Sequence, residues 1–152
     1  MSLPRHIKQP GPVSETRLFA VEGRGRSFSF TLEPGLRLVE AVRRGFAAHG
    51  FISGTVEFVD VALAPFTYVT PALSKTGENA AFYSEFYRPA GVSRIETGAM
   101  TIGLRDGQPF YHFHALWTEP DGTTHGGHVI PEETVVAEAA TVTALGIDGA
   151  LF

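Results

Sequence analysis

Alternating apolar and polar residues mark the first strands that the sequence predicts. Residues 27–32 place phenylalanine and leucine at every second position, with serine and threonine between them, which is the pattern of a half-buried strand. Residues 16–21 have a similar pattern. Gly23 and Gly25 lie between the two stretches and predict a hairpin turn that would include the sequence Arg24-Gly25-Arg26.

The periodicity changes from that of a strand to that of a helix over residues 34–49. Apolar residues fall on one helical face and charged residues on the other, which predicts an amphipathic helix. Gly50 is well placed to end it. The apolar face comprises Leu36, Val39, Ala41, Val42 and Phe46.

The rest of the chain favours strands joined by short turns. A loop from Pro65 that includes Lys75, Gly77 and Asn79 could flank a pocket. One helix and many strands in hairpin order predict an α+β fold with a mostly antiparallel sheet. The predicted strands cover residues 52–63, 80–87, 92–104, 110–118, 123–130 and 135–147, with turns at 105–107 and 119–122.

Length and composition predict one domain. The chain has 152 residues, of which 43% are hydrophobic and 18% charged, so it can bury a hydrophobic core without disulfides or a structural metal. Residues 1–13 carry three prolines and are expected to form an irregular arm, followed by a single domain over residues 14–152. The low charge content suggests that another subunit covers part of the surface. No apolar segment resembles a signal core or a membrane span, which favours a cytoplasmic protein.

The charge and the missing cysteines limit the chemistry. A net charge of -4 provides no general attraction for nucleic acid, and without cysteine no thiolate can act as ligand or nucleophile. Arg24-Gly25-Arg26 matches the centre of an AT-hook, a minor-groove binding motif. The motif's flanking prolines and basic residues are missing, so a turn is the better interpretation.

Four of the six histidines lie on one predicted hairpin. His112 and His114 are two residues apart on a strand and should therefore point to the same face. His128, on the return strand, joins them if the register pairs it with His114, whereas a slip of one residue would turn it away. His125 is expected on the opposite face and is left out of the ligand set.

Three neutral imidazoles suit zinc or another first-row divalent ion, with a further coordination position left open. The alternative is that His112, His114 and His128 are ordinary strand residues with polar tips. A metal-bound imidazole usually donates its second N–H to an oxygen acceptor. Glu57, Glu85 and Glu96 are the carboxylates considered for this role. Aromatic residues 82–87 are expected to pack in the core or at a subunit interface.

The hairpin resembles that of the PPC (plants and prokaryotes conserved) domain family. The resemblance is carried by His112-x-His114, by Asp121-Gly122 and by Gly126-Gly127-His128. Upstream, residues 32–35, the predicted helix and Ile52-Ser53-Gly54 also look like the family's pattern, so the resemblance covers about residues 15–147. The chain departs from the family's pattern at residues 92–98, where the acidic residue that opens the family's strand is not evident, and Glu96 is the nearest carboxylate.

The resemblance implies an α/β fold, a homotrimer and a metal site near the histidines, but no established reaction. In plant members the domain follows AT-hook motifs, and prokaryotic members are often described as DNA-binding by analogy. The leading hypothesis is a homotrimeric binding or regulatory protein that holds a divalent ion, zinc above others. A DNA-associated accessory protein and a metal-dependent hydrolase of a small substrate remain alternatives, and a non-enzymatic role is favoured over an enzymatic one. A small molecule or a partner protein could be bound.

Overall fold

Strands dominate the computed structural model, which describes residues 22–73 and 81–148 together with Glu15, Ala20 and Lys75. The β-strands are β1 (Arg24–Leu32), β2 (Gly54–Leu63), β3 (Tyr68–Val69), β4 (Pro71–Leu73), β5 (Ala81–Tyr83), β6 (Ser93–Arg105), β7 (Gln108–Thr118), β8 (Thr124–Val129) and β9 (Ala140–Asp148). The helices are α1 (Leu38–Ala48) and the short 3₁₀ helix η1 (Pro131–Glu133).

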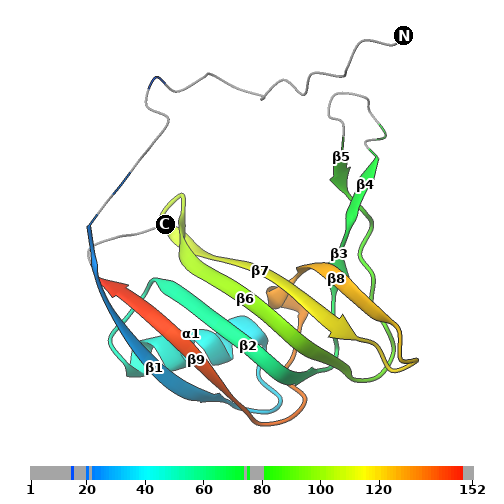
Figure 1. Ribbon diagram of the computed structural model, residues 1–152, viewed down its shortest axis with the longest axis horizontal. Helices are drawn as coiled ribbons and strands as arrows, with labels where there is room; N and C mark the ends of the chain where they lie inside the picture. Colours follow the sequence, from blue (N-terminus) through cyan, green and yellow to red (C-terminus); the bar gives the residue numbers. More distant parts are fainter. Residues whose placement is uncertain (1–14, 16–19, 21, 74, 76–80, 149–152) are drawn as a thin grey trace.

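Seven strands form one antiparallel sheet in the order β1-β9-β2-β6-β7-β8-β3 (Figure 1). The long β6 and β7 are joined by a tight turn in which Asp106 and Gly107 have positive φ angles. The C-terminal β9 inserts between β1 and β2, and so connects the two ends of the described chain. The predicted α+β fold with a mostly antiparallel sheet and one main helix is confirmed.

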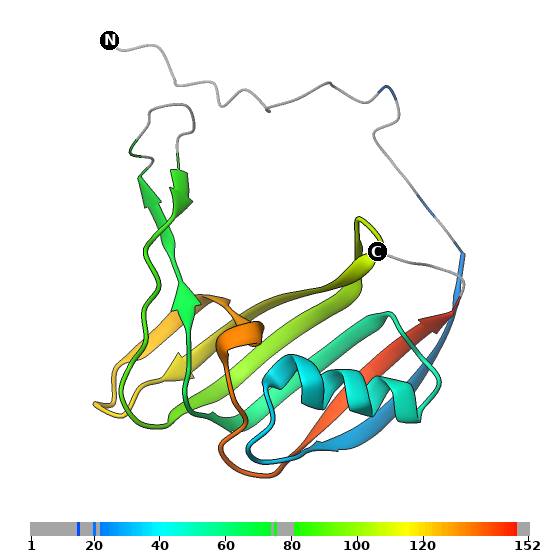
Figure 2. The same cartoon turned by 180° about the vertical axis from the view of Figure 1, so that it is seen from behind.

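Helix α1 packs against one face of the sheet, over the β1-β9-β2 side (Figure 2). Its apolar stripe is buried, with Leu38 and Val42 fully so, against Phe28 and Phe30 of β1. Gly45 is the point of closest approach, because a Cβ atom there would collide with the ring of Phe30. The opposite face of the sheet has no helix over it in the described part of the chain, and the histidines of β7 lie on that face.

Strands β4 and β5 form a separate two-stranded ribbon that projects beyond the main sheet (Figure 1). Its apolar side chains are largely in solvent: Leu73 is 86% exposed and Phe82 64%. Packing of the aromatic stretch 82–87 in the core, one of the two predicted alternatives, is therefore wrong. Its packing at a subunit interface stays a prediction.

One predicted local structure near the N-terminus differs from the one observed. Arg24-Gly25-Arg26 is not a hairpin turn but the start of β1, where Gly25 pairs with Ile147. The backbone pairing available from β9 overrides the turn preference of the glycine. The predicted arm 1–13 and nearly all of the predicted strand 16–21 lie outside the described residues.

Two further predicted strands are shorter than their composition suggested. The strand expected at 80–87 covers only Ala81–Tyr83, and the one expected at 135–147 begins at Ala140. Val135 and Val136 instead form isolated bridges to Arg37 and Leu63. Val136 is buried in the hydrophobic core, whereas Val135 is half-buried, and neither belongs to a ladder. Among the described residues, we find no helix with the length and apolar character needed to cross a membrane.

Candidate metal centre

Strand β7 places two histidines side by side on the face of the sheet that α1 does not cover. Its burial alternates: Tyr111 and Phe113 are buried, whereas His112 and His114 are exposed. This is the two-residue period of a half-buried strand. The sequence prediction that His112 and His114 share a face is therefore confirmed.

Strand β8 brings the third histidine to the same place. The register pairs His114 with His128, and cross-strand partners point to the same face. The glycines Gly126 and Gly127 pair regularly with Leu116 and Ala115, so no slip or bulge intervenes. The alternative register that would have turned His128 away is excluded.

The three imidazoles form a compact cluster. One ligand nitrogen from each of His112, His114 and His128 lies within 4.8 Å of the other two. The ring centroids are 4.8 Å apart for His112 and His114, 4.9 Å for His112 and His128, and 5.2 Å for His114 and His128. Residues from two strands and well separated in sequence thus converge at one point.

The cluster fits a tetrahedral divalent ion after small adjustments. Bonds of about 2.0 to 2.1 Å to zinc place neighbouring ligand nitrogens roughly 3.3 Å apart, so modest side-chain rotations would close the present spacing. Nδ1 of His128 is buried and has no hydrogen-bond partner among the described residues. A buried polar atom without a partner is costly, and metal coordination is one way to satisfy an imidazole nitrogen.

The surroundings favour the neutral imidazoles that metal binding needs. Burial lowers the pKa of His128, and the neighbouring His112 and His114 lower it further. Burial also lowers the pKa of His112, with additional effects from His114 and from the positive charge of Arg105. Both shifts disfavour the imidazolium form. These two rings are therefore prepared to act as neutral ligands near pH 7.

His125 lies on the other side of the hairpin, as predicted. It pairs with the fully buried Trp117, and its Nε2 atom is 3.7 Å from Oε1 of Glu119. The same oxygen accepts hydrogen bonds from the Tyr68 hydroxyl and the Trp117 indole N–H. His125 thus lies beside the hydrogen-bond network of Glu119 and outside the three-histidine cluster.

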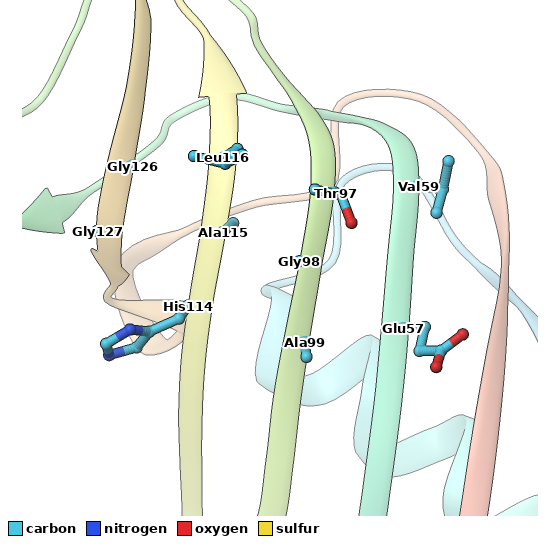
Figure 3. Close-up of a pocket in the computed structure, with 10 residues that line it drawn as sticks. All are labelled: Glu57, Val59, Thr97, Gly98, Ala99, His114, Ala115, Leu116, Gly126 and Gly127. Carbon is cyan, nitrogen blue, oxygen red and sulfur yellow. The ribbon is translucent and has the colours of Figure 1, made fainter.

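An open hollow of about 690 Å³ adjoins the cluster on the uncovered face of the sheet (Figure 3). Its lining spans four neighbouring strands, with Glu57 on β2, Ala99 on β6, His114 on β7, and Gly126 and Gly127 on β8. The registers place the first three of these residues in one row across the sheet, since Glu57 pairs with Ala99, Ala99 with His114, and His114 with His128.

Of the three carboxylates considered as partners of the histidines, only Glu57 lines this hollow. Glu96 accepts a hydrogen bond from Thr118, and no contact between Glu85 and the cluster is found in the described part of the chain. Two residues near the cluster were not predicted as part of the site. The ring centroid of Tyr83 lies 5.5 Å from that of His128, and the positive charge of Arg105 contributes to the lowered pKa of His112. The position of Tyr83 depends on the ribbon leaving the sheet next to β8, which no local pattern encodes.

Comparison with known proteins gives structural neighbours only. No protein-family model matches the chain, and no curated protein sequence does. A plant- and prokaryote-conserved (PPC) protein of Pyrococcus horikoshii has 16% identity and a TM-score of 0.66, with 88% of this chain and 87% of that one covered. A metal-containing protein of Archaeoglobus fulgidus has 20% identity and a TM-score of 0.67, with 90% and 89% covered. A protein of Bacteroides thetaiotaomicron described as a candidate DNA-binding protein has 13% identity and a TM-score of 0.56, with 85% and 86% covered.

These likenesses extend over most of each chain and show the fold. The chain has a PPC-like fold, as the resemblance of its hairpin predicted.

Proposed function

Given the PPC-like fold and the convergence of three imidazoles on its uncovered face, we propose that this protein binds one divalent metal ion, zinc in the first place, through His112, His114 and His128. The observation that carries the proposal is that one nitrogen from each ring lies within 4.8 Å of the other two. The unpartnered Nδ1 of His128 supports it. A neighbour with the same fold is named as a metal-containing protein, which is consistent with this assignment.

The role that we propose is binding or regulatory. Three histidine ligands leave a position on the ion open to water or to a ligand. None of the three histidines donates a hydrogen bond to a carboxylate of the described residues. A hydrolase would need such an acid or base close to the reacting water, so the hydrolase is the weaker alternative.

We further propose that the protein assembles as a homotrimer. Support comes from the projecting β4-β5 ribbon, because its exposed Leu73, Phe82 and Tyr83 are the kind of apolar surface that subunits cover. The ribbon also adjoins the cluster, since Tyr83 lies near His128. A subunit contact there would border the metal site.

DNA association is a second candidate, suggested by the description of one neighbour. Arg24 and Arg26 lie near the start of the edge strand β1, but the guanidinium group of Arg26 donates to the carbonyl of His49 and lies over the ring of Phe51. Binding to duplex DNA that weakens steeply as salt rises would support this candidate. Absence of binding at low salt would eliminate it.

Elemental analysis of untagged protein tests the metal proposal. Wild-type protein incubated with zinc and then desalted should contain about one ion per chain. His112→Ala and His128→Ala should each lose the ion, because two imidazoles alone hold zinc much more weakly. His125→Ala is the matched control, since it changes a histidine of the same hairpin outside the cluster, and it should retain the ion. Wild-type protein without zinc would refute the assignment.

A further inference from the structure

The hollow beside the histidine cluster is a groove along β6. The residues of β6 that line it are small (Thr97, Gly98 and Ala99), whereas the neighbouring β2 and β7 contribute the larger side chains of Glu57, Val59, His114 and Leu116. Because paired residues share a face, the registers define three rows across the groove. The rows are Thr55-Thr101-His112, Glu57-Ala99-His114 and Val59-Thr97-Leu116.

The two sides of the groove differ in charge. Glu57 forms no hydrogen bond or ion pair with any described residue, so its negative charge is uncompensated on the β2 side. On the other side stand the three histidines of β7 and β8, and beyond them the guanidinium group of Arg105 lies 3.6 Å above the ring of Phe110. With a divalent ion bound, the histidine side becomes strongly positive.

The lining of the groove is partly apolar. Val59 on β2 is 65% exposed and Leu116 on β7 is 48% exposed, and both line the hollow together with the methyl group of Ala99. Thr97 lies between Val59 and Leu116 in their row. Two strand spacings of about 4.8 Å separate the backbones of Glu57 and His114. Figure 3 shows the side chain of Glu57 and the ring of His114 pointing away from β6 on opposite sides, so only an extended molecule with several carbons can reach from the carboxylate to the histidine cluster.

We propose that this groove binds a small aliphatic amino acid in which several carbons separate the amine from the carboxylate. Its carboxylate would occupy the open position on the ion held by the histidines, its ammonium group would pair with Glu57, and its carbon chain would lie over Ala99, beside the row that contains Val59 and Leu116. The inference rests on the proposed metal site. Glu57 would be a specificity-determining residue, because its carboxylate recognises the amine of the ligand.

The test uses protein loaded with cobalt(II), whose visible absorption reports a new ligand on the ion. The probes are ε-aminocaproate and caproate, which share a carboxylate and a carbon chain but differ in the amine. The expected result is that ε-aminocaproate binds about two- to fivefold more tightly than caproate, the size of a partly exposed ion pair. Glu57→Gln should remove this difference by weakening ε-aminocaproate alone. Glu132→Gln, an exposed acid of η1, is the matched control and should keep the difference.

A second variant tests whether the probes bind in the groove. Ala99→Leu fills the floor of the groove with a side chain that points to solvent, so the protein should fold and keep its cobalt but bind both probes weakly. The inference is overturned if both probes bind equally to wild-type protein, if Glu57→Gln affects them alike, or if Ala99→Leu leaves ε-aminocaproate binding intact. In each of these cases a normal cobalt content would leave the proposed metal site standing. Protein that takes up no cobalt would overturn both.

Discussion

Glu119 accepts hydrogen bonds from side chains that lie on two different strands. Its Oε1 atom is 2.9 Å from the Tyr68 hydroxyl of β3 and 3.4 Å from the Trp117 indole nitrogen of β7. Its side chain is only 15% exposed, and Trp117 is fully buried. One carboxylate thus connects the edge of the sheet to the hairpin that carries the histidines.

We expect Glu119→Ala to lower the free energy of unfolding by about 1 to 3 kcal/mol, because two largely buried donors lose their acceptor. Urea unfolding followed by Trp117 fluorescence measures the change. Glu132→Ala, which removes an exposed carboxylate from η1, should change it by less than about 0.5 kcal/mol. Equal effects of the two substitutions would show that the network contributes no stability.

The hydroxyl of Tyr68 should make the free energy of unfolding depend on pH in the alkaline range. Burial, reinforced by the hydrogen bond to Glu119, raises the pKa of its hydroxyl from 10.0 to about 12. The folded protein therefore holds this proton more tightly than the unfolded chain. The contribution of the Tyr68 hydroxyl to the free energy of unfolding is therefore complete below pH 10. It is lost as pH rises from 10 to 12, at up to about 1.4 kcal/mol per pH unit.

Unfolding in urea at several values across this pH range tests the prediction. Tyr68→Phe should have a shallower decline than wild type. Some decline should persist, because burial also raises the pKa of Tyr111. If the two proteins decline in parallel, the hydroxyl of Tyr68 is not the group responsible.

At the scale of secondary-structure elements, the sequence predicted most where one face of an element is buried. Alternation located β1 and β7, and the helical period located α1, because in each case burial imposes the pattern. Prediction failed at Val135 and Val136, which are apolar but belong to no ladder. It also failed for residues 84–87, because aromatic composition does not distinguish a strand from an exposed connection.

The contact between α1 and β1 depends on Gly45. Alanine would normally favour a helix over glycine by about 1 kcal/mol. Here the added methyl group would collide with Phe30. We expect overpacking to outweigh propensity, so that Gly45→Ala lowers the free energy of unfolding by about 1 to 2 kcal/mol.

Thermal and urea unfolding measure this effect. Ala47→Ser changes an exposed position of the same helix and serves as the control, with an expected change below about 0.5 kcal/mol. A more stable Gly45→Ala variant would show that α1 can move away from the sheet at no cost.

At the scale of the whole molecule, we expect the chains to assemble as a homotrimer. Light scattering of wild-type protein should report a mass of about three times 16.4 kDa. Leu73→Glu combined with Phe82→Glu places charges on the exposed ribbon and should shift the mass towards that of one chain, because burying an unpaired charge is costly. A monomeric wild-type protein would contradict the prediction.

The candidate site could be predicted only in part, because it depends both on the spacing of residues along one strand and on the registers between strands. The two-residue spacing of His112 and His114 fixed their common face from sequence alone. The position of His128 required the hairpin register, which the structure supplies by pairing it with His114. The row that continues to Glu57 depends on two further registers. The tight turn at residues 105–107 signals the pairing of β6 with β7, whereas β2 and β6 are not consecutive in the chain and their pairing leaves no local signal.

The most direct test of the central claim is anomalous X-ray scattering at the zinc absorption edge, from crystals of the protein loaded with zinc. We predict one strong peak per chain, with one nitrogen each of His112, His114 and His128 about 2.0 to 2.1 Å from it. A peak at another position, or none at the cluster in protein shown to be exposed to excess zinc, would contradict the account.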